Sequence, residues 1–355
     1  MSAALFLAVA AIIFPFHFVS AQGHDEPVAA VEDSNVAEEH SEEEGKFNFK
    51  ETLMHHVQDA HELHFFDLGS FHAVVPLPMI LISGNGVDVF LSNKLHHGAY
   101  KGYHFDQEHK LARVDEAGFF DLSITKNVLT MFICVGLLLW LFISIAKSYR
   151  VKPNSAPKGK QNLFEIFILF IRDDVVKPIL GEKTNRYLPF LLTIFFFIWM
   201  NNMLGLIPGF AANVTGNIAV TLTLAMFTFI LILFSSNKHY WSHIFMPPGV
   251  PGFVKPILIL VEFLGVFIKP TALTIRLFAN MIAGHMIILS IVCMIFIFAE
   301  MNVIAGAGFS VVSLAFGIFM FSLELLIALL QAYIFTFLSA LFISQAFEVP
   351  HTEHH

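Results

Sequence analysis

Long apolar segments separated by short polar ones fill the C-terminal two-thirds of the chain. No Asp, Glu, Lys or Arg occurs from Tyr187 to Asn237, and a small soluble core cannot conceal an uncharged stretch of that length. The pattern predicts membrane helices at 128–146, 187–207 and 217–235, followed by two much longer helices at 254–299 and 304–347. We therefore expect an all-α polytopic membrane protein.

The last two predicted helices are too long to cross a membrane upright. A helix of about 45 residues spans about 68 Å, whereas the hydrocarbon core of a bilayer is about 30 Å thick. No clear turn signal interrupts either helix, so the sequence predicts two long, tilted, antiparallel helices. Such helices would expose a large surface, which indicates that they pack along a partner.

The N-terminal third has a different character. Residues 1–21 are apolar and end in small residues, Val19-Ser20-Ala21, as in a cleaved signal peptide; an uncleaved anchor is the alternative, because the segment lacks Lys and Arg. Either reading places residues 22–120 outside the cytoplasm. Residues 22–45 contain nine acids and no Lys or Arg, which is typical of a solvated tail, and residues 79–92 predict a β-hairpin.

Basic residues set the predicted orientation. They follow the first membrane helix as Lys147, Arg150, Lys152, Lys158 and Lys160, so that end should be cytoplasmic. Residues 161–181 mix apolar and charged positions and predict an interfacial amphipathic helix. The membrane domain is thus expected over 121–350, with a short cytoplasmic tail at 351–355.

Several classes of site are not expected. His61-Glu62-Leu63-His64 is one residue short of the HExxH zinc motif, so we interpret this His-rich stretch, which also holds His55 and His56, as a polar helix or loop. His239 and His243 have helical spacing, but the prolines that follow favour a loop. Cys134 and Cys293 lie in apolar segments, which argues against a disulfide framework or thiol metal site. No basic patch indicates nucleic acid, no phosphate loop occurs, and no cofactor is expected.

Charged residues recur inside the first long helix. Lys255, Glu262, Lys269 and Arg276 are seven residues apart, and seven residues come within about 20° of two full helical turns, so all four should share one face. Arg276 has apolar helix on both sides. An arginine at that depth costs about 2.5–3.5 kcal/mol and usually serves ion movement; a buried structural pair with an acid is the alternative.

The second long helix carries Glu324, and Gln331 follows seven residues later. The antiparallel arrangement predicts that Arg276 lies level with Gln331 and that His285 lies level with Glu324, with Asn202 at a similar depth. Two offset polar patches separated by a fixed positive charge suit a proton path, because His titrates near neutral pH and Arg keeps its proton. A packing salt bridge between His285 and Glu324 is the alternative.

These residues carry a family resemblance. The stretch KPTALTIRLFANMIAGH, from Lys269 to His285, resembles the signature of subunit a of F-type ATP synthases. The stretch from Glu324 to QAYIF at Gln331–Phe335 is similar to the family's final helix, and Asn202–Pro208 is similar to its outer-channel segment. The resemblance covers roughly residues 120–350.

The resemblance implies a membrane helix set whose last two helices curve against a rotating ring of c subunits. It implies a role for seven residues: Arg276 faces the ring carboxylate with Gln331 beside it, His285, Glu324 and Asn202 form the outer half-channel, Glu262 belongs to the cytoplasmic half-channel, and Asn280 is a polar position near the arginine. Some members carry an acid where this chain has His285 and a histidine where it has Glu324; here the pair is exchanged.

The resemblance also implies a non-catalytic subunit of a bacterial inner membrane complex, in contact with the ring, b-type stalk subunits and lipid. The sequence leaves both H⁺ and Na⁺ open as the ion. Two other functions are weighed against this one. A secondary transporter would show internal repeats with paired broken helices, and the chain shows none. A haem protein would need facing histidines inside the bundle, and the crossings offer only His285.

Overall fold

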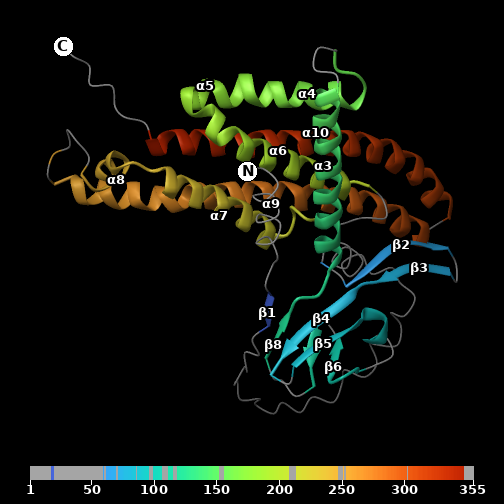
Figure 1. Ribbon diagram of the computed structural model, residues 1–355. Coiled ribbons are helices and arrows are strands. Elements are labelled where there is room, and N and C mark those ends of the chain that lie inside the picture. Colours follow the sequence, from blue (N-terminus) through green and yellow to red (C-terminus); the bar gives the residue numbers. More distant parts are fainter. Residues whose placement is uncertain are drawn as a thin grey trace.

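The computed structural model describes residues 17–19, 59, 61–68, 71–84, 86–95, 99–105, 111–114, 118–151, 156–207, 213–246, 251, 253–301 and 303–347. The predicted acidic tail, His55, His56, the C-terminal tail and all of the predicted signal peptide except His17–Val19 lie outside these residues. Within them, the expected fold class is confirmed: long apolar helices follow a small β region (Figure 1).

The β region is built from antiparallel pairs. Its strands are β1 (His17–Val19), β2 (Glu62–Leu68), β3 (Phe71–Pro76), β4 (Pro78–Ser83), β5 (Gly86–Leu91), β6 (Tyr103–Phe105), β7 (Leu111–Arg113) and β8 (Phe119–Asp121), with a 3₁₀ turn at Ser92–Leu95. Four strands form one sheet in the order β1-β8-β4-β5, and β2-β3 and β6-β7 form separate pairs. The predicted hairpin at 79–92 is confirmed. The polar helix or loop expected around His61–His64 is wrong, because β2 begins at Glu62.

Alternation along β4 explains the core of this region. Met79 and Leu81 are buried, whereas Ile82 is exposed, as expected for a strand with one face against a core. Phe90 of β5 and Tyr103 of β6 complete the cluster. The region is therefore a small folded unit with its own apolar core.

Four residues separate β8 from the helical part, which begins at Lys126. Its elements are α3 (Lys126–Val151), α4 (Lys160–Phe170), a π-helical segment (Ile171–Val176), α5 (Lys177–Leu180), a 3₁₀ turn (Gly181–Lys183), α6 (Thr184–Gly205), α7 (Ile218–Ser235), α8 (Lys238–Phe245), α9 (Lys255–Met301) and α10 (Val303–Phe347). The loop expected around His239 and His243 is wrong over α8. There, Ile244 packs with Phe229 and Val266 in a small apolar cluster, which stabilises a helical turn before the prolines.

The two long helices lie antiparallel and cross α3 at a steep angle (Figure 1). The β region lies at one end of α3, and α4 and α5 lie at the other. Among the described residues, five helical spans are long and apolar enough to cross a membrane. In the apolar, membrane-length stretches of α9 and α10, only 11% and 17% of the residues are buried, against 39–56% in the other three spans. The long pair therefore presents a large open face.

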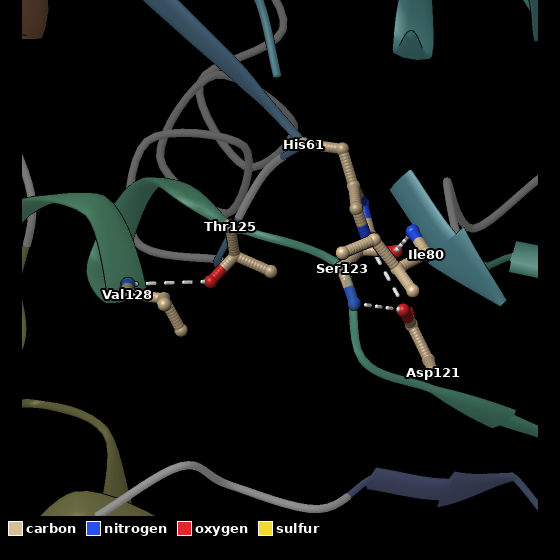
Figure 2. Close-up of polar contacts among 6 residues, drawn as sticks. All are labelled: His61, Ile80, Asp121, Ser123, Thr125 and Val128. Atoms are coloured by element: carbon tan, nitrogen blue, oxygen red, sulfur yellow. Dashed lines mark hydrogen bonds and ion pairs between the residues drawn. The ribbon is translucent and has the colours of Figure 1, made fainter. Parts of the chain in front are cut away.

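A small polar network joins the sheet to α3 (Figure 2). The Asp121 carboxylate lies 3.3 Å from Nε2 of His61 and accepts a 2.8 Å hydrogen bond from the Ser123 amide. Ser123 Oγ accepts from the Ile80 amide of β4, and Thr125 Oγ1 accepts from the Val128 amide in the first turn of α3. Burial raises the pKa of Asp121, but the hydrogen bonds from His61 and Ser123 outweigh it and hold the pKa below its usual range.

The lowered pKa of Asp121 predicts that the stability of the sheet depends on pH. A carboxylate whose pKa is lower in the folded state adds stability above its unfolded pKa of about 3.9, and this stability is lost as the pH falls through the folded pKa. We expect Asp121→Asn to destabilise the β region at neutral pH by about 1–2 kcal/mol and to weaken its acid sensitivity. Hydrogen exchange of the Ile80 and Ser123 amides measures this, and Asp88→Asn, at an exposed pair with Lys101, is the control. Equal exchange in all three proteins would contradict it.

Candidate functional site

Asn202 lies fully buried near the end of α6 and links three segments. Its Nδ2 donates to the Ala328 carbonyl of α10 over 3.3 Å. Its Oδ1 accepts a 2.6 Å hydrogen bond from Thr215 Oγ1, in the turn before α7. A buried amide in a membrane protein needs such partners because lipid supplies none. The side chain therefore holds the ends of α6 and α7 against the middle of α10.

His285 of α9 and Glu324 of α10 lie in contact, as the antiparallel register predicts. Nδ1 of His285 lies 3.1 Å from Oε1 of Glu324 and 3.2 Å from the Met281 carbonyl, while Nε2 lies 3.4 Å from the Gly205 carbonyl of α6. Neither buried oxygen of Glu324 has a hydrogen-bond partner in the described part of the chain. The contact is therefore an ion pair only when His285 is protonated, and neither carboxylate oxygen is occupied by a hydrogen bond from the described chain.

Gly284 makes this contact possible. A Cβ built at Gly284 would lie 2.6 Å from Oε1 of Glu324, well inside van der Waals contact. Glu324 is only 3% exposed, so its carboxylate occupies the space that a side chain at position 284 would fill. The absence of a side chain at this one position brings the carboxylate to His285.

Arg276 lies on the other side of α9. Its side chain is exposed, as is Asn280 one turn later. No acid or hydrogen-bond acceptor contacts its guanidinium among the residues that the structure describes. The alternative of a buried arginine paired with a structural acid is therefore wrong for this chain as it stands alone.

Gln331 is buried on α10. Contacts on both sides show the register of the long helices: Lys269 Nζ donates to Gln345 Oε1 over 2.8 Å, and His285 meets Glu324 further along. This register places Gln331 near the level of Arg276. No hydrogen bond joins the two side chains within the described structure, because one faces the bundle and the other faces outward.

Glu262 lies toward the other end of the open face and is partly exposed. It lies near Tyr240 of α8, where burial, together with the Glu262 carboxylate, raises the pKa of the phenol. Glu262 also acts electrostatically on Lys269. Glu262 and Lys269 precede Arg276 along α9 by two heptads and one heptad, whereas His285 follows it.

Two residues of the site were missed by sequence reasoning. Thr215 bonds directly to Asn202, and Gly284 sets the approach of Glu324. Gly284 stands inside the motif quoted above, next to His285, which is a signal for close approach. Among the described residues, no group of three metal-binding side chains lies together.

The sequence is similar to those of known proteins. Residues 128–344 match the family described as ATP synthase A chain. ATP synthase subunit a of Chloroherpeton thalassium is 43% identical over 266 residues, which cover 73% of this chain and 77% of that protein. The chain belongs to the ATP synthase subunit a family.

Other subunit a proteins show the same relationship. Subunit a of Chlorobium phaeobacteroides strain DSM 266 is 46% identical over 243 residues, covering 67% of this chain and 68% of the relative. Subunit a 2 of Chlorobium luteolum is 37% identical over 343 residues, covering 92% and 87%. Residues 52–129 match a domain of unknown function (DUF8433).

Membership in the subunit a family settles the broad questions raised by the sequence. The chain is a multi-pass membrane protein of the ATP synthase subunit a family. All seven candidate residues fall inside the family match at 128–344.

The close approach at Gly284 predicts that the effects of substitutions at Gly284 and Glu324 on stability are not additive. Gly284→Ala should lower the free energy of unfolding in detergent by about 1–3 kcal/mol, because the new methyl group must displace the Glu324 carboxylate. In a Glu324→Ala background the same change should cost less than about 0.5 kcal/mol, since the conflict is gone and Ala favours helix. Denaturant titration of the four proteins measures the difference.

Gly136→Ala on α3 is the matched control, because a Cβ there meets no atom within 4 Å. It should leave stability unchanged or raise it slightly in both backgrounds. Equal costs of Gly284→Ala with and without Glu324 would show that the carboxylate does not occupy this space.

Proposed function

We propose that this chain forms two offset half-channels that carry protons to and from a rotating ring of c subunits, and so couples ion flow to ATP synthesis. The observation that carries the proposal is the exposed guanidinium of Arg276 on the open face of α9, without a partner in the described chain. A charge at membrane depth is costly unless protein or water compensates it. A carboxylate on a neighbouring ring is the partner with matching charge.

The surroundings of Arg276 favour a close neighbour. Ala272, Ala279 and Ala283 are exposed on the same side of α9, and small residues let helix backbones approach closely in membranes. Larger apolar residues such as Ile268 and Ile275 continue the exposed face. A ring of helices packed here would cover the apolar surface and bring its carboxylate to the arginine.

The outer half-channel is assigned to His285, Glu324 and Asn202. The imidazole and the carboxylate lie close enough, at 3.1 Å, to exchange a proton, and neither carboxylate oxygen is occupied by a hydrogen bond from the described chain. Asn202 braces this group against α6 and α7. Protons from outside would bind the ring carboxylate after leaving this pair.

The inner half-channel is assigned to Glu262, with Gln331 and Asn280 as polar neighbours of the arginine. Glu262 lies beside α8, at the end of α9 opposite His285. A proton carried almost a full turn by the ring would leave past this carboxylate. Arg276 separates the paths because a guanidinium does not release its proton, so ions cannot pass directly from one path to the other.

The subunit itself does no bond chemistry in this proposal; ATP forms elsewhere in the complex. Its partners are the c ring, b-type peripheral stalk subunits and membrane lipid, and the ion is H⁺, or Na⁺ where the ring's ligands favour it. The sheet lies at the end of α3 opposite Lys147, Arg150 and Lys160 (Figure 1). The positive-inside rule then places the sheet outside a bacterial plasma membrane and the C-terminus in the cytoplasm.

Cleavage of the signal peptide makes a direct prediction. Mature protein should begin at Gln22, because a signal peptidase cuts after the small residues that end at Ala21. N-terminal sequencing of protein purified from its own membrane measures this. Cleavage would remove β1 from the edge of the sheet, whereas a start at Met1 would contradict cleavage and favour the anchor.

Arg276→Ala tests the mechanism in the reconstituted holoenzyme. We expect ATP-driven proton pumping to be lost and passive proton leak to rise, because the fixed charge between the two paths is gone. Pumping is followed by the quenching of a pH-sensitive dye, and leak by the decay of an imposed pH gradient. Assembly is checked by the subunit composition of the purified complex.

Lys269→Ala is the matched control, since it removes a positive charge from the same helix one heptad away. Its ammonium is bound to Gln345 and lies over the Phe342 ring, so it should leave pumping within a few-fold of the parent. Near-normal pumping by an assembled Arg276→Ala complex would refute the proposal.

A further inference from the structure

The turn between α6 and α7 contains a buried amide that the proposed half-channel does not use. Asn213 is 5% exposed. Its Oδ1 accepts a 2.9 Å hydrogen bond from the Gly216 amide, and this bond fixes which end of the side chain is oxygen. Nδ2 is therefore buried, and it has no hydrogen-bond partner in the described part of the chain.

The chain makes room for this side chain. A Cβ at Gly216 would overlap all three end atoms of the Asn213 amide, so a side chain at that position would have to displace the amide. The turn itself requires only the oxygen of Asn213, which Asp supplies equally well. The turn does not use the NH₂ group, which indicates a second role for Asn213.

Asn213 adjoins the polar residues of the outer half-channel. Two residues later, the buried hydroxyl of Thr215 binds Asn202, and Asn202 binds the Ala328 carbonyl, one turn from Glu324 on α10. Three buried acceptor atoms of α6 and α10 have no hydrogen-bond partner in the described chain: Oδ1 of Asn201 and both oxygens of Glu324. Hydrogen bonds from Thr215 to Asn202 and from Asn202 to Ala328 connect the turn that holds Asn213 with the part of α10 that carries Glu324.

Buried atoms of this kind require water. Each buried polar atom without a partner costs about 1–3 kcal/mol, and polar interiors usually satisfy such atoms with ordered water that makes about three hydrogen bonds. Nδ2 of Asn213 can only donate, whereas Asn201 Oδ1 and the carboxylate of Glu324 accept. A water molecule does both and can therefore satisfy groups of either kind.

We propose that Asn213 is a further positioning residue of the outer half-channel, whose NH₂ group holds the water through which protons reach Glu324. The inference rests on the proposed function and deepens it. It assigns to the turn at 213–217 the outermost polar contact of the path. Asn213 acts through bound water and does not carry the proton itself.

Asn213→Asp separates this role from the turn. The variant keeps the oxygen that binds Gly216 but replaces the donor with a titratable oxygen. In the reconstituted holoenzyme, we expect the rate of proton-driven ATP synthesis to depend on the pH of the proton-supplying side differently from the parent, with at least a threefold difference between about pH 5 and pH 8. Asn213→Leu, which removes donor and acceptor, should slow synthesis about tenfold, a change of about 1.4 kcal/mol in barrier.

Asn217→Asp is the matched control. Asn217 caps α7 by accepting from the Ala219 amide, and Asp caps equally well, so its pH profile should match the parent. If Asn213→Asp shows the parental profile, or if it fails to assemble while Asn217→Asp assembles, Asn213 serves only the turn and the inference is overturned. Arg276→Ala, measured in the same preparation, reports on the proposed function separately: loss of pumping there alongside a parental Asn213→Asp profile refutes only the role of Asn213.

Discussion

The packing of α9 against α10 at Gly284 is the constraint on which the membrane part depends. A carboxylate inside an apolar bundle is costly unless charge or hydrogen bonds compensate it. Glu324 meets this requirement by entering the space above Gly284, where its oxygen comes within 3.1 Å of His285. His285 in turn reaches the end of α6 through the Gly205 carbonyl. The lack of a side chain at Gly284 thus allows side chains of α9 and α10 and a carbonyl of α6 to meet at one polar site.

The contact between His285 and Glu324 also determines which residues of α9 face away from the bundle. His285 and Arg276 are nine residues apart, which is about half a turn in net rotation on a helix. With His285 directed into the bundle, Arg276 must face away from it, and it is indeed exposed. The same helix therefore directs His285 toward Glu324 in the interior and a permanent positive charge toward the open face of the long pair. A protein that had to separate two proton paths could do so with this geometry and no moving part of its own.

The sequence predicts much of this arrangement. Helix length, the antiparallel order and seven-residue spacing were enough to place His285 beside Glu324, because those features depend only on the period of the helix. The residues that sequence reasoning missed are small or polar ones whose roles depend on tertiary contacts. Thr221, Thr223 and Thr228 bond to carbonyls of their own helix, whereas Thr215 bonds to Asn202, and no local pattern separates the two cases. Likewise, α8 forms because Ile244 finds apolar neighbours on α7 and α9, which the flanking prolines do not reveal.

The length of the last two helices affects how far apart their polar residues lie. α9 and α10 contain 47 and 45 residues, about twice the number needed to cross a bilayer upright, and they lie at a steep angle to α3 (Figure 1). Tilting lengthens the part of each helix that stays within the apolar layer. It therefore separates Glu262 from His285 along the layer as well as through it, with Arg276 between them. Two upright helices would stack these polar groups one above another, and a single water-filled path could then join them; the tilt makes an offset between them possible.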